Sequence, residues 1–176
     1  MSIKNEYISK ILEYQQNIPV PIVALSNKFG IEVFKVSNMS NNISGAIIKD
    51  NNKYTIYTNK NEPENRRRFT IAHELAHFLL HKNIIDNQCN GNLTDAKDIG
   101  IMYRSKLSTI FEREANILAS EILMPIDKLK KFIYEDNIDS ISKLSDIFKV
   151  SKEAIRIRTD KLENNFLIKD TIDLKK

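Results

Sequence analysis

Residues 68 to 77 read Arg68-Phe69-Thr70-Ile71-Ala72-His73-Glu74-Leu75-Ala76-His77, and this stretch decides the fold. It carries an H-E-x-x-H motif inside an unbroken helical pattern. Positions four apart lie on one face of an α-helix, roughly 6 Å apart along its axis, so His73 and His77 can direct both imidazoles at one Zn²⁺. Glu74 lies beside them, where its carboxylate can reach a metal-bound water. With three His and twelve Glu in 176 residues, chance would produce this motif with a probability of roughly 0.003.

The elements before the motif follow from short apolar periods and turn residues. They predict two helices and three strands, over residues 2–16, 23–29, 31–36, 44–49 and 54–57. The turn Asp50-Asn51-Asn52-Lys53 joins the last two strands. We therefore expect a small antiparallel three-stranded sheet directly before the motif helix.

The motif helix is predicted to begin near Pro63 and to end at about His81. Residues 83–104 show no clear period and predict a long connection. A second helix is predicted over residues 108–123, and three short helices over residues 126–163. The expected fold class is α+β: the sheet packs on the motif helix and on the second helix, which carries a further ligand, and a helix-turn-helix-like segment ends the chain.

Length and composition predict a single domain over residues 1–176, divided into N-terminal helices and sheet (1–62), zinc-site helices (63–125) and a C-terminal helical segment (126–165). One cysteine excludes an internal disulfide framework, and no apolar run approaches the about 18 residues of a membrane span. We expect a cytoplasmic protein with no membrane partner. A net charge of +4 permits an acidic partner but does not establish nucleic-acid binding, and the sequence specifies no oligomeric state.

A catalytic zinc site needs a third protein ligand besides the two motif histidines. His81 continues their spacing, but eight residues of straight helix span about 12 Å, too far for one ion; a core or second-shell role is expected for it. Glu112 on the second helix is the better ligand, and Asn116, four residues later, could orient the Nδ1–H of a ligand histidine. Glu114 points about 200° around that helix from Glu112 and is expected to be a solvated surface carboxylate.

Three segments together resemble the ImmA/IrrE family of zinc metallopeptidases. They are residues 68–81, Glu112-Arg113-Glu114-Ala115-Asn116 and Ile122-Leu123-Met124-Pro125, which correspond to R-F-T-x-A-H-E-x-x-H, E-x-x-A-N and an L-L-M-P-like segment. Ala76 stands where members often have Gly, a small change. The resemblance implies a zinc held by His73, His77 and Glu112. It also implies proteolysis of a cognate helix-turn-helix repressor, in mobile elements or stress responses.

In the implied reaction, a zinc-bound water attacks a peptide carbonyl while Glu74 takes its proton and returns it to the leaving amine. Tyr103, Arg104 and His81 are candidates for stabilising the oxyanion, and none of them is preferred. An extended substrate could add to the sheet as a further strand.

Two alternatives belong to other functional classes. One is a non-proteolytic, zinc-dependent regulatory or sensor protein that acts by binding its partner. The other is a DNA-binding regulator acting through residues 138–160, where Lys152, Arg156 and Arg158 could meet phosphate. Direct nucleic-acid binding is the less favoured of these readings, because the same helices can simply pack against the rest of the domain.

Overall fold

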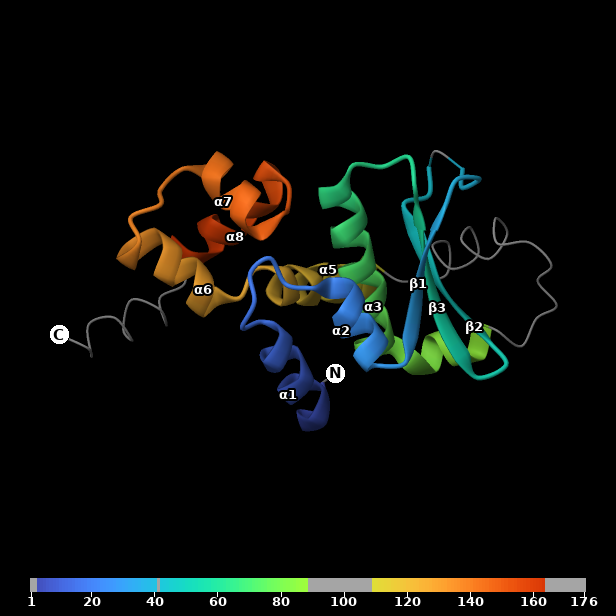
Figure 1. Ribbon diagram of the computed structural model, residues 1–176. Coiled ribbons are helices and arrows are strands. Elements are labelled where there is room, and N and C mark those ends of the chain that lie inside the picture. Colours follow the sequence, from blue (N-terminus) through green and yellow to red (C-terminus); the bar gives the residue numbers. More distant parts are fainter. Residues whose placement is uncertain (1–2, 41, 89–108, 164–176) are drawn as a thin grey trace.

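The computed structural model describes residues 3–40, 42–88 and 109–163 of the chain, and it has the expected α+β architecture (Figure 1). Its elements in chain order are α1 (Asn5–Tyr14), α2 (Ile22–Lys28), β1 (Ile31–Val36), β2 (Gly45–Asp50), β3 (Lys53–Asn59), α3 (Glu64–Gln88), α5 (Thr109–Leu123), α6 (Ile126–Lys130), the π-helix η1 (Lys131–Glu135), α7 (Ile141–Phe148) and α8 (Lys152–Glu163). Among these helices, none is long and apolar enough to cross a membrane.

The sheet is mixed, with strand order β1-β3-β2. β2 and β3 form the expected antiparallel hairpin, and its turn residues Asn51 and Asn52 both have positive φ, as a tight hairpin turn requires. The expectation of a wholly antiparallel sheet was wrong for β1, which pairs in parallel with β3 from Ile31↔Tyr54 onward. The reason is the strand order: the chain reverses from β1 to β2 and again to β3, and β3 then inserts between the two. Alternation of side chains cannot reveal such an insertion.

The motif helix α3 runs beyond its expected end at His81. That residue has non-helical angles, φ −124° and ψ 26°, so the helix bends there and continues to Gln88. The last turns are tied to the sheet: Asp86 accepts hydrogen bonds from Lys82 at 2.7 Å and from the Tyr54 hydroxyl, and pairs with Lys49 at 3.1 Å. The first residues of the expected connection are therefore helical.

The Asp86 cluster predicts a specific acid sensitivity. Burial opposes the charged form, but hydrogen bonds from Lys82, Tyr54 and Lys49 outweigh it and lower the pKa of Asp86 from 3.8 to about 2. A depressed pKa contributes stability that is present above the unfolded value and lost as the pH falls towards 2. We expect Asp86→Asn to lower the free energy of unfolding by about 1 kcal/mol at pH 6 and to lose that deficit near pH 2, as measured by urea unfolding.

The matched control is Asp139→Asn, which replaces an exposed aspartate outside this cluster. It should unfold like the wild type at both pH values. An equal loss of stability in the two variants would contradict a particular role for Asp86.

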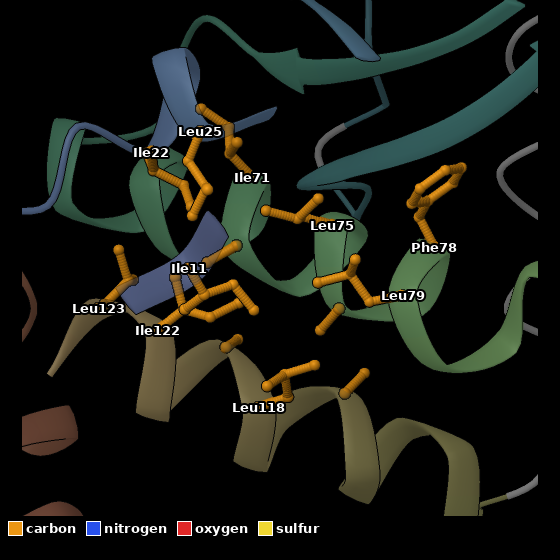
Figure 2. Packing of buried hydrophobic residues seen from close by; sticks show 14 of the residues in the cluster. Ile11, Ile22, Leu25, Ile71, Leu75, Phe78, Leu79, Leu118, Ile122 and Leu123 are labelled. Carbon is orange, nitrogen blue, oxygen red and sulfur yellow. The ribbon is translucent and has the colours of Figure 1, made fainter. Parts of the chain in front are cut away.

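The core forms mainly between α3 and α5, and α1 and α2 cover one end of it (Figure 2). Its apolar side chains on these four helices include Ile11, Ile22, Leu25, Ile71, Leu75, Leu79, Leu118, Ile122 and Leu123. The same cluster continues into the C-terminal helices through Leu129, Leu144, Phe148, Val150 and Ile155. The helix carrying the motif is thus held rigidly on its apolar side, while its polar side carries His73 and Glu74.

Backbone carbonyls of the α7–α8 turn are held by the start of α3. Arg68 donates to the Lys149 carbonyl at 3.2 Å and to the Val20 carbonyl at 2.8 Å, and Asn65 donates to the Val150 carbonyl at 3.0 Å. Lys149 has a φ of 53° and ends α7 in the left-handed conformation. These contacts place the beginning of α8 beside the beginning of the motif helix.

Candidate metal centre

Two helices bring three ligand groups together. The Nε2 atoms of His73 and His77, one turn apart on α3, are separated by 3.0 Å. Glu112, in the first turn of α5, places its two carboxylate oxygens 3.3 Å from the Nε2 of His73 and 3.4 Å from that of His77. Ligands at about 2.1 Å from one tetrahedral ion are separated by about 3.4 Å from each other. The three side chains could therefore hold one metal ion.

The charges of this group suit a cation. Hydrogen bonds from His73 and His77 hold the pKa of Glu112 far below its usual range, so its carboxylate is ionised. Burial opposes a charge on His73, but its hydrogen bond to Glu112 and the nearby Glu74 outweigh that effect and raise the pKa of this imidazole. A proton on His73 and a metal ion compete for the same position between two imidazoles and a carboxylate.

Asn116 lies behind the first histidine, as its spacing from Glu112 predicts. Its Oδ1 is 3.0 Å from the Nδ1 of His73. An amide oxygen can only accept, so the Nδ1 of His73 carries a proton; when this ring is neutral, its Nε2 has the lone pair that faces the other two groups. Asn116 thus selects the tautomer that can bind a metal.

Glu74 is buried beside the ligands, with 4% of its surface exposed. Its Oε2 accepts a hydrogen bond from the Ile47 backbone N–H of β2 at 3.2 Å. The backbone N–H of Asn59 donates to the carbonyl of Ser44, its partner on the neighbouring strand. Along an antiparallel ladder, residue pairs that exchange hydrogen bonds alternate with pairs that do not. Because Ile47 lies three residues beyond Ser44, its N–H points away from β3. Gly45 permits this approach, because a Cβ there would lie 2.4 Å from a Thr70 methyl group. The carboxylate and the outer edge of β2 therefore meet at the metal group.

His81 lies behind His77, away from the three converging ligand atoms. It is 1% exposed, its Nδ1 is 3.2 Å from the Nδ1 of His77, and its Nε2 is 2.9 Å from a carboxylate oxygen of Glu114. The expectation that Glu114 is merely solvated was wrong: its side chain is 37% exposed and binds His81. The even spacing of His73, His77 and His81 signals a shared helix face; α3 bends at His81, and the ring of this residue contacts Glu114 on α5. Tyr103 and Arg104, the other oxyanion candidates, lie outside the described residues.

A cleft of about 840 Å³ opens onto the metal group. It is lined by α3, by α5 and by the residues directly before β2 and α8, and its walls include Ser44, Thr70, Glu74, Glu112 and Ser151. A second cavity of about 570 Å³ lies between α5 and α8, and Phe69, Glu112, Asn116 and Ser151 line both. The two cavities therefore adjoin at these four residues. Both are large enough for several residues of an extended chain.

Comparison with known proteins identifies the family of this chain. The family model of the IrrE N-terminal-like domain matches residues 26–160, which include α3, α5 and most of α8. A solved structure of a Mycobacterium tuberculosis transcriptional regulator superposes with a TM-score of 0.61 at 16% identity, over 93% of this chain and 49% of that one. The chain spans about half the length of that protein, with which it shares the fold, and no curated protein matches it significantly. The predicted resemblance is thereby confirmed, and the chain belongs to the ImmA/IrrE metallopeptidase family.

Proposed function

We propose that this protein is a zinc-dependent endopeptidase that cleaves a helix-turn-helix transcriptional repressor. One observation carries the enzymatic part of the proposal: His73, His77 and Glu112 converge within ligand distance of one another, and the buried carboxylate of Glu74 stands beside them in an open cleft. Two histidines and a carboxylate are a frequent ligand set of catalytic zinc. The repressor as substrate is supported by the family alone.

In this mechanism His73, His77 and Glu112 would hold the zinc. When bound, zinc activates a water molecule as nucleophile and polarises the peptide carbonyl. Glu74 accepts the proton of that water and passes it to the nitrogen of the leaving amine. Asn116 keeps His73 in the tautomer whose Nε2 binds metal, so the chain supplies both the ligands and their orientation.

The position of β2 supports an extended substrate. Its Ile47 N–H points outward at Glu74, so a peptide pairing with this edge would pass directly beside the proposed general base. The cleft continues between α5 and α8, where Ile117 and Ile157 line the second cavity. We assign this cavity to an apolar side chain of the substrate, near the scissile bond.

The cavity assignment predicts that Ile157→Asp lowers kcat/KM about tenfold, mainly through KM, because an apolar contact with the substrate is lost and a charge is added. Zinc content should be unchanged. Ile110→Asp is the matched control, since Ile110 is an exposed isoleucine on α5 that lines neither cavity. Equal kinetics of the two variants, measured on the same cleaved repressor, would contradict the assignment.

The function itself is tested by cleavage. Zinc-loaded wild type and Glu74→Gln are incubated with purified helix-turn-helix repressors from the source organism, and products are identified by intact mass. New N-termini in cells expressing either form provide an unbiased second measurement. Cleavage of a repressor by the wild type alone supports the proposal. A full biological effect from Glu74→Gln would instead favour the regulatory or sensor alternative.

The DNA-binding alternative has less support. Ser151 and Ala154, at the start of α8, line the cavities, and the preceding turn is held by Asn65 and Arg68. In a helix-turn-helix DNA reader, these first residues of the second helix enter the major groove. We expect no shift of duplex DNA mobility at low salt.

A further inference from the structure

We propose that Glu114 and His81 form a positioning pair that acts through His77 on the metal centre. The inference rests on the proposed metal site, but not on peptidase activity. The proposed reaction assigns no role to either group. They are the nearly fully buried imidazole of His81 and the carboxylate of Glu114, two residues beyond the ligand Glu112.

The order of donors and acceptors in this pair is fixed by chemistry. Glu114, as a carboxylate, accepts from the Nε2–H of His81 at 2.9 Å. The neutral His81 ring then has a lone pair on Nδ1, which accepts from the Nδ1–H of His77 at 3.2 Å. When His77 is neutral, as metal binding requires, its Nε2 is left with the lone pair, and this atom faces Glu112 and His73. One carboxylate thus sets the tautomers of two rings in succession.

The backbone bends where this contact forms. His81 leaves helical angles, with φ −124° and ψ 26°, and its ring packs on Phe111 with centroids 4.8 Å apart. An apolar side chain could fill the same space without burying two ring nitrogens that need partners. Both nitrogens of His81 have a partner, one on α3 and one on α5.

Helix α5 therefore serves the metal centre at three positions. Glu112 is the direct ligand, Asn116 holds His73, and Glu114 holds His77 through His81. The two histidines differ in the charge of the group that their Nδ1 hydrogen bonds lead to. The neutral amide of Asn116 accepts from His73, whereas the hydrogen bonds from His77 lead through His81 to the carboxylate of Glu114. An anionic acceptor makes the ligand imidazole more basic and strengthens its bond to the metal.

The tautomers can be read directly, because the chain has only three histidines. Long-range ¹H–¹⁵N correlation spectra of the zinc-loaded wild type at neutral pH should show His81 with its proton on Nε2 and His77 with its proton on Nδ1. In Glu114→Ala, His81 should lose this single tautomer. A wild-type His81 with its proton on Nδ1 would overturn the proposal without any variant.

Zinc affinity is the second measurement, by competition with a chelator. We expect Glu114→Ala and His81→Ala to bind zinc about 10- to 100-fold more weakly, and the double variant to lose no more than the weaker-binding single variant, because both act along one path. Glu114→Gln should recover part of the affinity, since its amide oxygen still accepts from His81. The control is Glu121→Ala, an exposed carboxylate on the same helix.

Two outcomes would overturn the proposal that Glu114 and His81 act as a positioning pair. One is a zinc affinity of Glu114→Ala within twofold of that of Glu121→Ala. The other is a double variant whose loss of binding free energy equals the sum of the two single losses. Circular dichroism of the zinc-free variants separates these effects from unfolding. Should Glu114→Ala fail to fold, the wild-type tautomers and the Glu114→Gln affinity still decide. If no substrate is ever cleaved, the proposed function fails, but the tautomers and the affinities retain their meaning.

Discussion

Replacing Glu74 with glutamine is expected to leave zinc bound and to slow peptide cleavage by about 100- to 10,000-fold, the usual contribution of a general acid–base residue. The amide cannot take a proton from the attacking water. It can still accept the hydrogen bond from the Ile47 N–H, so the helix and β2 should keep their positions. The measurement is the single-turnover rate on the cleaved repressor, together with the zinc content of the same sample.

The matched control for this variant is Glu121→Gln. Glu121 is an exposed carboxylate on α5 that lines neither of the two cavities and lies outside the metal group. Its removal should change the rate little. Loss of zinc from Glu74→Gln would show that Glu74 is a ligand rather than a base, and an unchanged rate with zinc bound would remove it from the mechanism.

Replacing Glu112 with alanine is expected to empty the metal site. Structural zinc sites with four ligands bind with about 10–16 kcal/mol, or about 3 kcal/mol per ligand if shared equally, so one lost ligand weakens binding by roughly 100-fold or more. Elemental mass spectrometry should find near one zinc per chain in the wild type and almost none in this variant. Cleavage should be lost with the metal.

Glu112 is the sharpest position for this test because its side chain is 37% exposed, so its removal disturbs little of the core. His77→Ala should also lose zinc, but it leaves the buried His81 without its partner and can lower stability as well. Glu121→Ala, on the same helix, should keep full zinc content. A well-folded wild type that binds no zinc would favour a protein acting through binding alone.

Local patterns in the sequence predict much of this arrangement. The spacing of His73 and His77 follows from the period of one helix, and Glu112 and Asn116 lie one turn apart on another. The convergence of the two helices is then required by their apolar faces, and the structure brings the three ligand groups together as expected. The features that the sequence predicts are those that depend on the residues of a single helix or strand.

The missed features each depend on two elements at once. The parallel pairing of β1 depends on where β3 inserts, which no strand encodes by itself. The bend at His81 and the contact with Glu114 depend on each other across α3 and α5, so neither is visible in a helical period. The helical residues after His81 are held by the sheet through Asp86 rather than by their own propensity.

The shared core of the C-terminal helices has a consequence for where the molecule can be cut. Leu144, Phe148 and Ile155 are buried in the same cluster as α3 and α5, and α8 forms one wall of the second cavity. Truncation after Pro125 would expose the apolar side chains of α3 and α5 in this cluster. It would also remove the α8 wall of the second cavity. We therefore expect the smallest unit that keeps both the core and the second cavity to extend through α8.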